Sequence, residues 1–193
     1  LLGEEQSGQI EAIGFSLYTE LLERAVRAIK AGRIPDLDDA SHHGAEVELH
    51  LAALIPDDYL PDVHTRLMLY KRIATCADDE ALRAMQVEMI DRFGLLPVPV
   101  KNLFAVTALK LRATALGIRR LEFGEHGGRV VFHGQPGFEP LNLIRLVQGE
   151  PKTYAFDGQD KLRIKAALPD PAQRLAAARV LLGRLAGRAV DPD

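Results

Sequence analysis

The sequence predicts an α+β fold, in which a helical hairpin and further helices pack on short antiparallel strands. Apolar residues recur at helical spacing over residues 55–116 and 171–188, whereas apolar and polar residues alternate over short segments joined by glycine-containing turns. Because helices and strand pairs occur in separate runs, this organisation favours α+β over a parallel α/β sheet.

Composition excludes several classes of protein. The chain has 193 residues, 47% of them hydrophobic, and a formal net charge of −3, which is atypical of a domain that holds nucleic acid by itself. Its single cysteine excludes an internal disulfide framework and fits a reducing compartment, so we expect a cytoplasmic protein. No apolar run approaches the ~18 residues of a membrane span. The start, LLGEEQSG, has neither Met nor signal peptide, so we expect a piece of a longer protein.

The first third of the chain predicts a domain boundary. The spacing predicts an amphipathic helix over residues 10–31. Its apolar surface is wide, so we expect other parts of the protein to pack on more than one side of it. Residues 32–44 are a polar linker, so we expect 1–44 to be separate from a domain formed by 45–193. Residues 45–52 alternate as in a half-buried strand.

Residues 55–97 predict the helical hairpin. Pro61 suits the first position of the first helix, because its missing N–H has no partner there. The expected buried face of this helix comprises Val63, Leu67, Tyr70 and Ala74. Asp78 and Asp79 can cap the second helix, and Gly94 suits its end. The expected buried stripe of the second helix comprises Leu82, Met85, Met89 and Phe93.

The opposite side of the second helix carries acidic residues and one aliphatic residue. These are Glu80, Val87, Glu88 and Asp91. Such a face can meet a basic partner, but charged helix sides are more often simply solvated, and spacing leaves both readings open.

The remaining elements follow in separate runs. We expect a helix over 99–116, strands over 118–123 and 129–133 around a glycine-rich turn, and a short helix over 141–147. Strands over 153–156 and 161–166 and a closing helix over 171–188 complete the chain. The closing helix carries Arg174, Arg179, Arg184 and Arg188, which wind around its axis, so we expect solvated side chains rather than a basic stripe.

No catalytic or metal-binding pattern is present in the sequence. It lacks a Walker A loop and an HExxH-like histidine pair, and the glycines at 124, 127 and 128 lead into a strand rather than a helix. Cys76 lies beside two aspartates, which raise a thiol pKa, so we do not expect a nucleophile. We therefore expect neither catalysis nor a bound metal or cofactor in this chain.

Three segments together carry a resemblance to a known family. They are LLGEEQSGQIEAIGFSLYTELLERAV, AEVELHLAALIPDDYLPDVHTRLMLYKRIA and VEMIDRFGLLP. In combination they resemble the C-terminal end of the bacterial transcription-repair coupling factors, which are large ATP-driven translocases. The resemblance implies that a motor binding ATP, Mg²⁺ and double-stranded DNA precedes this chain. It also implies that residues 1–44 are the last loop, helix and linker of that motor, and that Gln6 belongs to the motif that couples hydrolysis to translocation.

The same resemblance implies a regulatory role for residues 45–193. In the family, this C-terminal domain docks on an N-terminal module that recognises UvrA, and it covers the UvrA-binding surface until the protein engages stalled RNA polymerase. The docking contact joins acidic groups to arginines of the module. The matching positions are Glu88 and Asp91, with Val87 and Arg92 at the rim. The alternative, an accessory nucleic-acid-binding module, is disfavoured by the net acidity and the scattered arginines.

Overall fold

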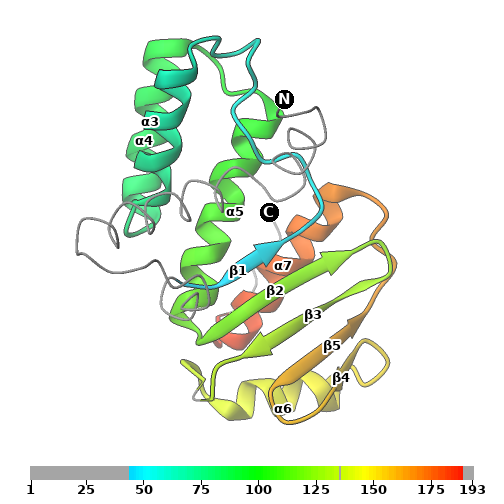
Figure 1. Ribbon diagram of the computed structural model, residues 1–193. Coiled ribbons are helices and arrows are strands. Elements are labelled where there is room, and N and C mark those ends of the chain that lie inside the picture. Colours follow the sequence, from blue (N-terminus) through cyan, green and yellow to red (C-terminus); the bar gives the residue numbers. More distant parts are fainter. Residues whose placement is uncertain (1–43, 135, 189–193) are drawn as a thin grey trace, which may run out of the picture. The chain divides into compact units, whose positions relative to one another are not determined.

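The computed structural model describes residues 44–134 and 136–188 (Figure 1). These residues form two compact units. We call residues 52–104 the helical unit, and residues 44–51 with 105–188 the sheet unit. The fold is α+β, as predicted, and the sheet lies entirely in the second unit.

The helical unit contains α3 (Val63–Ala74), α4 (Asp79–Phe93) and the first part of α5 (Val98–Ala115). α3 and α4 form the predicted hairpin. On α4, the predicted stripe is confirmed, with Leu82, Met85 and Met89 buried and Phe93 partly buried.

Two expectations for α3 were wrong. Its N-cap is Asp62, whose carboxylate accepts a hydrogen bond from the backbone N–H of Thr65 at 2.7 Å, so Pro61 precedes the helix. The cap takes precedence because a carboxylate satisfies an otherwise unpaired N–H, which proline at the first position cannot do. Of the predicted buried residues, Tyr70 is confirmed, but Val63, Leu67 and Ala74 are exposed. The buried face is rotated, and it contains Leu69 and Ile73 beside Tyr70. α3 has apolar residues on both sides, so spacing alone did not select the buried one.

The sheet unit contains five strands in the order β1-β2-β3-β5-β4. The strands are β1 (Glu46–Glu48), β2 (Ile118–Gly124), β3 (Gly127–Phe132), β4 (Tyr154–Phe156) and β5 (Lys161–Lys165). The end of α5, α6 (Pro140–Gly149) and α7 (Pro171–Leu185) cover one face of the sheet, where the apolar core lies (Figure 1). No helix of the described residues covers the other face, which we call the open face (Figure 1).

The first strand departs from the antiparallel prediction. β1 pairs parallel to β2, with Val47 opposite Leu121, and the other three pairings are antiparallel. Parallel neighbours need a long crossover connection, and here the helical unit supplies it. In the sequence, the helical unit therefore lies between two strands that are neighbours in the sheet.

Two arginines of α7 are not simply solvated, contrary to expectation. Arg174 is 5% exposed and donates hydrogen bonds to the backbone carbonyls of Leu168, His50 and Pro169 at 2.9, 3.0 and 2.8 Å. Arg184 pairs with Glu150 at 2.5 Å. The carbonyls at the end of β1 and in the loop before α7 lack strand partners, and a guanidinium supplies several donors at once.

No helix in the described part of the chain is both long enough and apolar enough to pass through a lipid bilayer.

Candidate functional site

α4 is terminated as its sequence predicted, and this places its outer residues. The Asp78 carboxylate accepts from the backbone N–H of Ala81 at 2.8 Å, which confirms it as the N-cap. Gly94 follows the last turn with φ of +87°, and its N–H donates to the carbonyl of Ile90 at 2.9 Å. Gly94 has an extended ψ of −168° rather than a left-handed helical one, and it still uses the backbone freedom of glycine.

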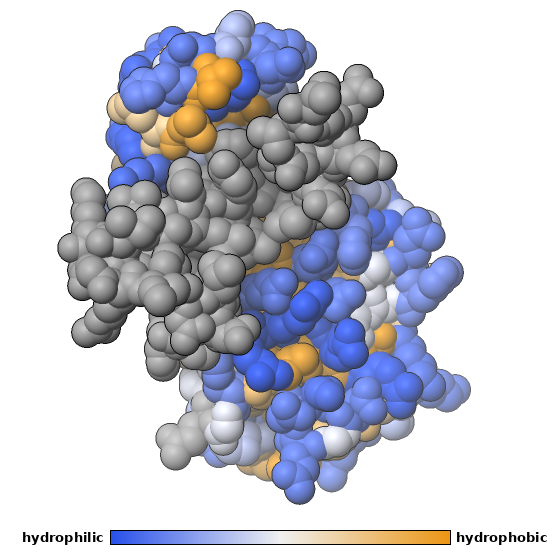
Figure 2. Space-filling model, in the orientation of Figure 1, coloured by the Kyte–Doolittle hydropathy of each residue, from blue (hydrophilic) through white to orange (hydrophobic). Residues whose placement is uncertain are grey.

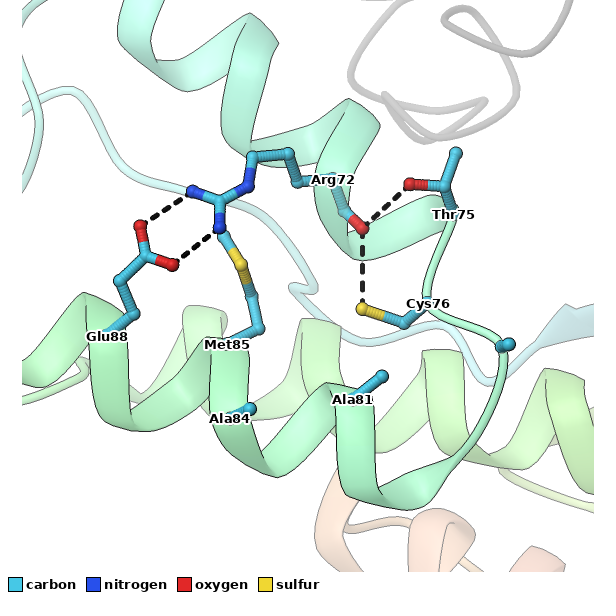
Figure 3. A pocket seen from close by; sticks show the side chains of 8 residues that line it. Arg72, Thr75, Cys76, Ala81, Ala84, Met85 and Glu88 are labelled. Carbon is cyan, nitrogen blue, oxygen red and sulfur yellow. Dashed lines mark hydrogen bonds and ion pairs between the residues drawn. The ribbon is translucent and has the colours of Figure 1, made fainter.

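Glu88 is held by two arginines of the same hairpin. Arg72 of α3 donates to both carboxylate oxygens, with Nη1–Oε1 at 2.6 Å and Nη2–Oε2 at 2.5 Å (Figure 3). Arg92, one turn along α4, donates to Oε1 at 3.0 Å. A bidentate pair fixes the orientation of a carboxylate more closely than a single contact does. We call Arg72, Glu88, Asp91 and Arg92 the hairpin charge cluster.

These contacts change the acidity of Glu88. The hydrogen bonds from Arg72, and then those from Arg92, lower the pKa of the carboxyl from 4.5 to about 2. The side chain is 35% exposed, so Glu88 is ionised and reachable from outside at neutral pH. Glu88 raises the pKa of Arg72 in turn, mainly through the same hydrogen bonds.

The outer face of α4 is therefore not simply acidic. Val87 is 58% exposed and Asp91 is exposed, and Asp91 makes no ion pair with another described residue. The two acids and two arginines of the hairpin charge cluster have a formal charge of zero. Any partner meets a pattern of fixed charges around an apolar side chain, rather than a block of negative charge.

A shallow, open depression adjoins the Arg72–Glu88 pair (Figure 3). It has a volume of about 510 Å³, and small side chains line it where α3 leads into α4, namely Ala77, Ala81 and Ala84. Thr75, Cys76 and Met85 also line it. Because alanines leave the helix surface low, a long side chain from another protein surface can lie here against apolar atoms and reach Glu88 with its end.

The remaining candidates are the Cys76 thiol, a metal site and Gln6. The Cys76 thiol lies 3.3 Å from the Arg72 carbonyl, to which it donates, and its pKa is raised first by burial and then by Asp78. Within residues 44–134 and 136–188, no three His, Cys, Asp or Glu side chains are grouped to hold a metal ion. Gln6 lies outside the described residues.

Arg72 was not among the residues predicted from the sequence to belong to the site. Its contact with Glu88 joins positions 16 residues apart, and it depends on how the two arms of the hairpin align. The available signal was a basic residue in the last turn of α3.

The comparisons with known proteins agree on one family. Residues 49–143 match the TRCF domain family model. The chain is 46% identical over 190 residues to the transcription-repair-coupling factor of Escherichia coli (strain K12), covering 98% of this chain and 17% of that protein. It is 48% identical over 175 residues to the transcription-repair-coupling factor of Haemophilus influenzae, covering 91% of this chain and 15% of that protein. The chain thus spans less than a fifth of the length of these curated relatives.

A solved structure shares the fold. The crystal structure of the C-terminal domain of a transcription-repair coupling factor matches with a TM-score of 0.60 at 21% identity, covering 76% of this chain and 96% of that domain. The family model, the relatives and the fold thus converge. The chain belongs to the transcription-repair coupling factor family and contains its TRCF domain.

Proposed function

We propose that residues 45–193 are a non-catalytic regulatory domain, which docks through the outer face of α4 on an N-terminal UvrA-binding module of a longer parent. The docked module would be unable to bind UvrA, so the contact is autoinhibitory. Glu88 and Asp91 are the acidic partners for arginines of the module, and Val87 and Arg92 lie at the rim. The observation that carries this proposal is an ionised, oriented carboxylate at Glu88 beside the carboxylate of Asp91, which makes no ion pair with another described residue.

The geometry supports a contact that can open. Glu88 is already oriented by Arg72, so a partner arginine would bind without first ordering this side chain. The carboxylates are partly or fully exposed, and exposed ion pairs typically contribute only ~0.2–1 kcal/mol each. A few such pairs can shift the equilibrium towards the docked state and still allow the domain to undock.

The alanine-lined depression supports an arginine rather than a lysine as the partner group. The depression ends at Glu88, and a guanidinium can share the carboxylate with Arg72 and Arg92 through its several donors. The methylene groups of the partner arginine would lie against Ala81 and Ala84.

The rest of the parent's activity belongs to the same proposal. A longer parent would carry an ATP- and Mg²⁺-dependent motor that translocates on double-stranded DNA in the cytoplasm, and it would bind RNA polymerase and UvrA. Residues 1–44 would be the end of that motor, with Gln6 in its translocation motif.

The test compares charge reversals in the full-length parent. Asp91→Arg is the sharper variant, because Glu88→Arg also removes the acceptor of Arg72 and Arg92 and places three cations together. We expect Asp91→Arg to raise the affinity for UvrA and the ATPase rate, with the melting temperature of the domain unchanged. Titration calorimetry with UvrA and a steady-state ATPase assay measure both.

Asp58→Arg is the matched control. It makes the same charge change at an exposed loop position of the helical unit, and we expect wild-type UvrA affinity. Unchanged UvrA affinity in Asp91→Arg, or an equal rise in both variants, would refute docking through the α4 face.

A further inference from the structure

The net charge of the chain conceals an uneven distribution between the two units. Described residues of the sheet unit include 14 Lys and Arg against nine Asp and Glu, a formal charge of +5. Those of the helical unit include six Lys and Arg against eight Asp and Glu, a formal charge of −2. The overall value of −3 therefore does not describe the sheet unit, and the charge argument against nucleic acid does not apply to it.

Five of these cations lie on the open face of the sheet. They are Arg120 on β2, Arg129 on β3, and Lys161, Arg163 and Lys165 on β5. The register places them on one side, because their strand neighbours Leu121, Val130, Leu162 and Ile164 are buried on the other. In Figure 2, hydrophilic residues predominate over this face, with smaller hydrophobic patches between them. We call these five residues the basic sheet face.

Acidic side chains compensate only one edge of the basic sheet face. Glu122 lies 3.5 Å from both Arg120 and Arg129, and Glu46 lies 3.4 Å from Arg120. Lys161, Arg163 and Lys165 make no ion pair with another described residue. The uncompensated charge thus increases from β1 towards β5.

Two like charges lie directly opposite each other on this surface. Arg129 and Arg163 are register partners on β3 and β5. Like charges in this position destabilise an antiparallel pair, and an anion bound between them removes the repulsion. Lys161, Arg163 and Lys165 also repeat every second residue, a spacing of about 6.7 Å along an extended strand.

The occupant that fits this surface is a phosphate backbone rather than a protein. Protein interfaces concentrate their binding energy in buried apolar or aromatic anchors. On the described part of this face the large apolar side chain is Val131, which is only 6% exposed. Phosphate contacts need only cations in a polar setting. Phe156 of β4 is 51% exposed, but it is the register partner of the buried Leu162 and so lies on the other face. Among the described residues, the basic sheet face thus has no exposed aromatic ring for a base to stack on, which favours a duplex over a single strand.

We propose that the basic sheet face binds the phosphate backbone of double-stranded nucleic acid, without reading its base sequence. This contact lies on the sheet unit and does not rest on the autoinhibitory contact of α4. Its affinity is of the non-specific kind, with a Kd on the order of 10⁻⁴–10⁻⁶ M that weakens steeply with salt.

The test titrates a fluorescent duplex of mixed sequence with the whole 193-residue chain at several salt concentrations, using anisotropy. The variant combines Arg163→Glu and Lys165→Glu, two exposed positions on one strand. We expect its affinity to fall by about tenfold or more, and the slope of log K against log salt to decrease by about 2, one unit for each lost phosphate contact.

The matched control combines Arg145→Glu and Arg179→Glu. It makes the same charge change at exposed positions of α6 and α7, which cover the other side of the sheet. We expect an affinity loss of less than about threefold, because screening limits charge effects at this range. Circular dichroism and thermal unfolding verify that both variants fold.

Three results would overturn the proposal. They are no binding by the wild-type chain at low salt, equal losses in the two double variants, and tighter binding to polyglutamate than to the duplex. The last would assign the surface to an acidic protein segment.

Discussion

Arg72 of α3 and Glu88 of α4 form a bidentate ion pair that bridges the two arms of the hairpin. The acid that sequence reasoning assigned to a partner is therefore already bound within the chain. A docking partner must share this carboxylate with Arg72, so the strength of docking and the stability of the hairpin are coupled through one side chain.

Glu88→Gln is expected to change how stability depends on pH. The folded-state pKa of Glu88 is about 2, below its ordinary 4.5, so its stabilising effect is fully present above pH 4.5 and is lost as the pH falls towards 2. The melting temperature of the variant should be below wild type at pH 7, and the difference should vanish near pH 2. Calorimetric scans from pH 7 to 2 measure it.

Arg72→Gln provides the control for that experiment. It removes the other half of the pair, so it should reproduce the loss at pH 7, and the double variant should add little to either change. A difference between wild type and Glu88→Gln that is the same at pH 7 and pH 2 would contradict the assignment.

Arg72→Met is expected to strengthen docking, because the negative charge that it uncovers at Glu88 outweighs the loss of orientation by Arg72. The hairpin charge cluster has a formal charge of zero. Removing Arg72 gives it a charge of −1, frees Oε2 of Glu88 and leaves Oε1 with Arg92 alone. Binding of a basic UvrA-recognition module, measured by calorimetry at low salt, should tighten by about threefold. Lys101→Met removes an exposed cation of α5 and should have no such effect. Weaker binding of Arg72→Met would show that Arg72 chiefly orients Glu88.

Arg174→Met is expected to destabilise the sheet unit. The substitution keeps an unbranched apolar stem but leaves the carbonyls of His50, Leu168 and Pro169 without their donor. We expect a loss of about 2–4 kcal/mol in the free energy of unfolding, because each buried unsatisfied group costs about 1–3 kcal/mol. Urea unfolding measures it, and Arg179→Met on the exposed side of α7 should stay within about 0.5 kcal/mol of wild type. Equal effects would mean that the buried contacts of Arg174 contribute nothing.

Gly127→Ala is expected to destabilise the chain, and Gly149→Ala to stabilise it. Gly127 has φ of +130°, and an added Cβ would clash with the backbone carbonyl oxygen of Ile164 on β5. The last residue of α6, Gly149, has open space around it. We expect a loss of more than about 2 kcal/mol at Gly127 and a gain of about 0.4–1 kcal/mol at Gly149. Thermal unfolding of the pair checks the signs, and the same sign at both positions would contradict the geometry.

Local sequence signals predicted the elements and several of their ends, although not the start of α3. Asp78 and Gly94 delimit α4 because a cap and a positive φ depend on neighbours a few residues away. The turn between β2 and β3 and the start of α7 at Pro171 followed from equally local chemistry.

Features that depend on distant residues were missed. The alternation of residues 45–52 revealed a half-buried strand, but not that β1 would pair parallel to β2. Arg174 looked solvated because its carbonyl acceptors are contributed by loops and by the end of β1, which helical spacing does not reveal. At the candidate site, Val87, Glu88 and Asp91 were placed on one face of α4, whereas the role of Arg72 required the alignment of two helices.

β1 emerges from the ribosome before every residue that holds it in the sheet. Its ion-pair partner across the sheet, Arg120, is 74 residues later than Glu46, and the Arg174 that binds the carbonyl of His50 is 124 residues later than that residue. The helical unit is synthesised in between and can fold first, since domains form as units during translation. β1 is thus synthesised before the helical unit but can join the sheet only after that unit has been made. In a nascent chain stalled before β2, we expect a complete α3–α4 hairpin and a β1 that has no strand to pair with.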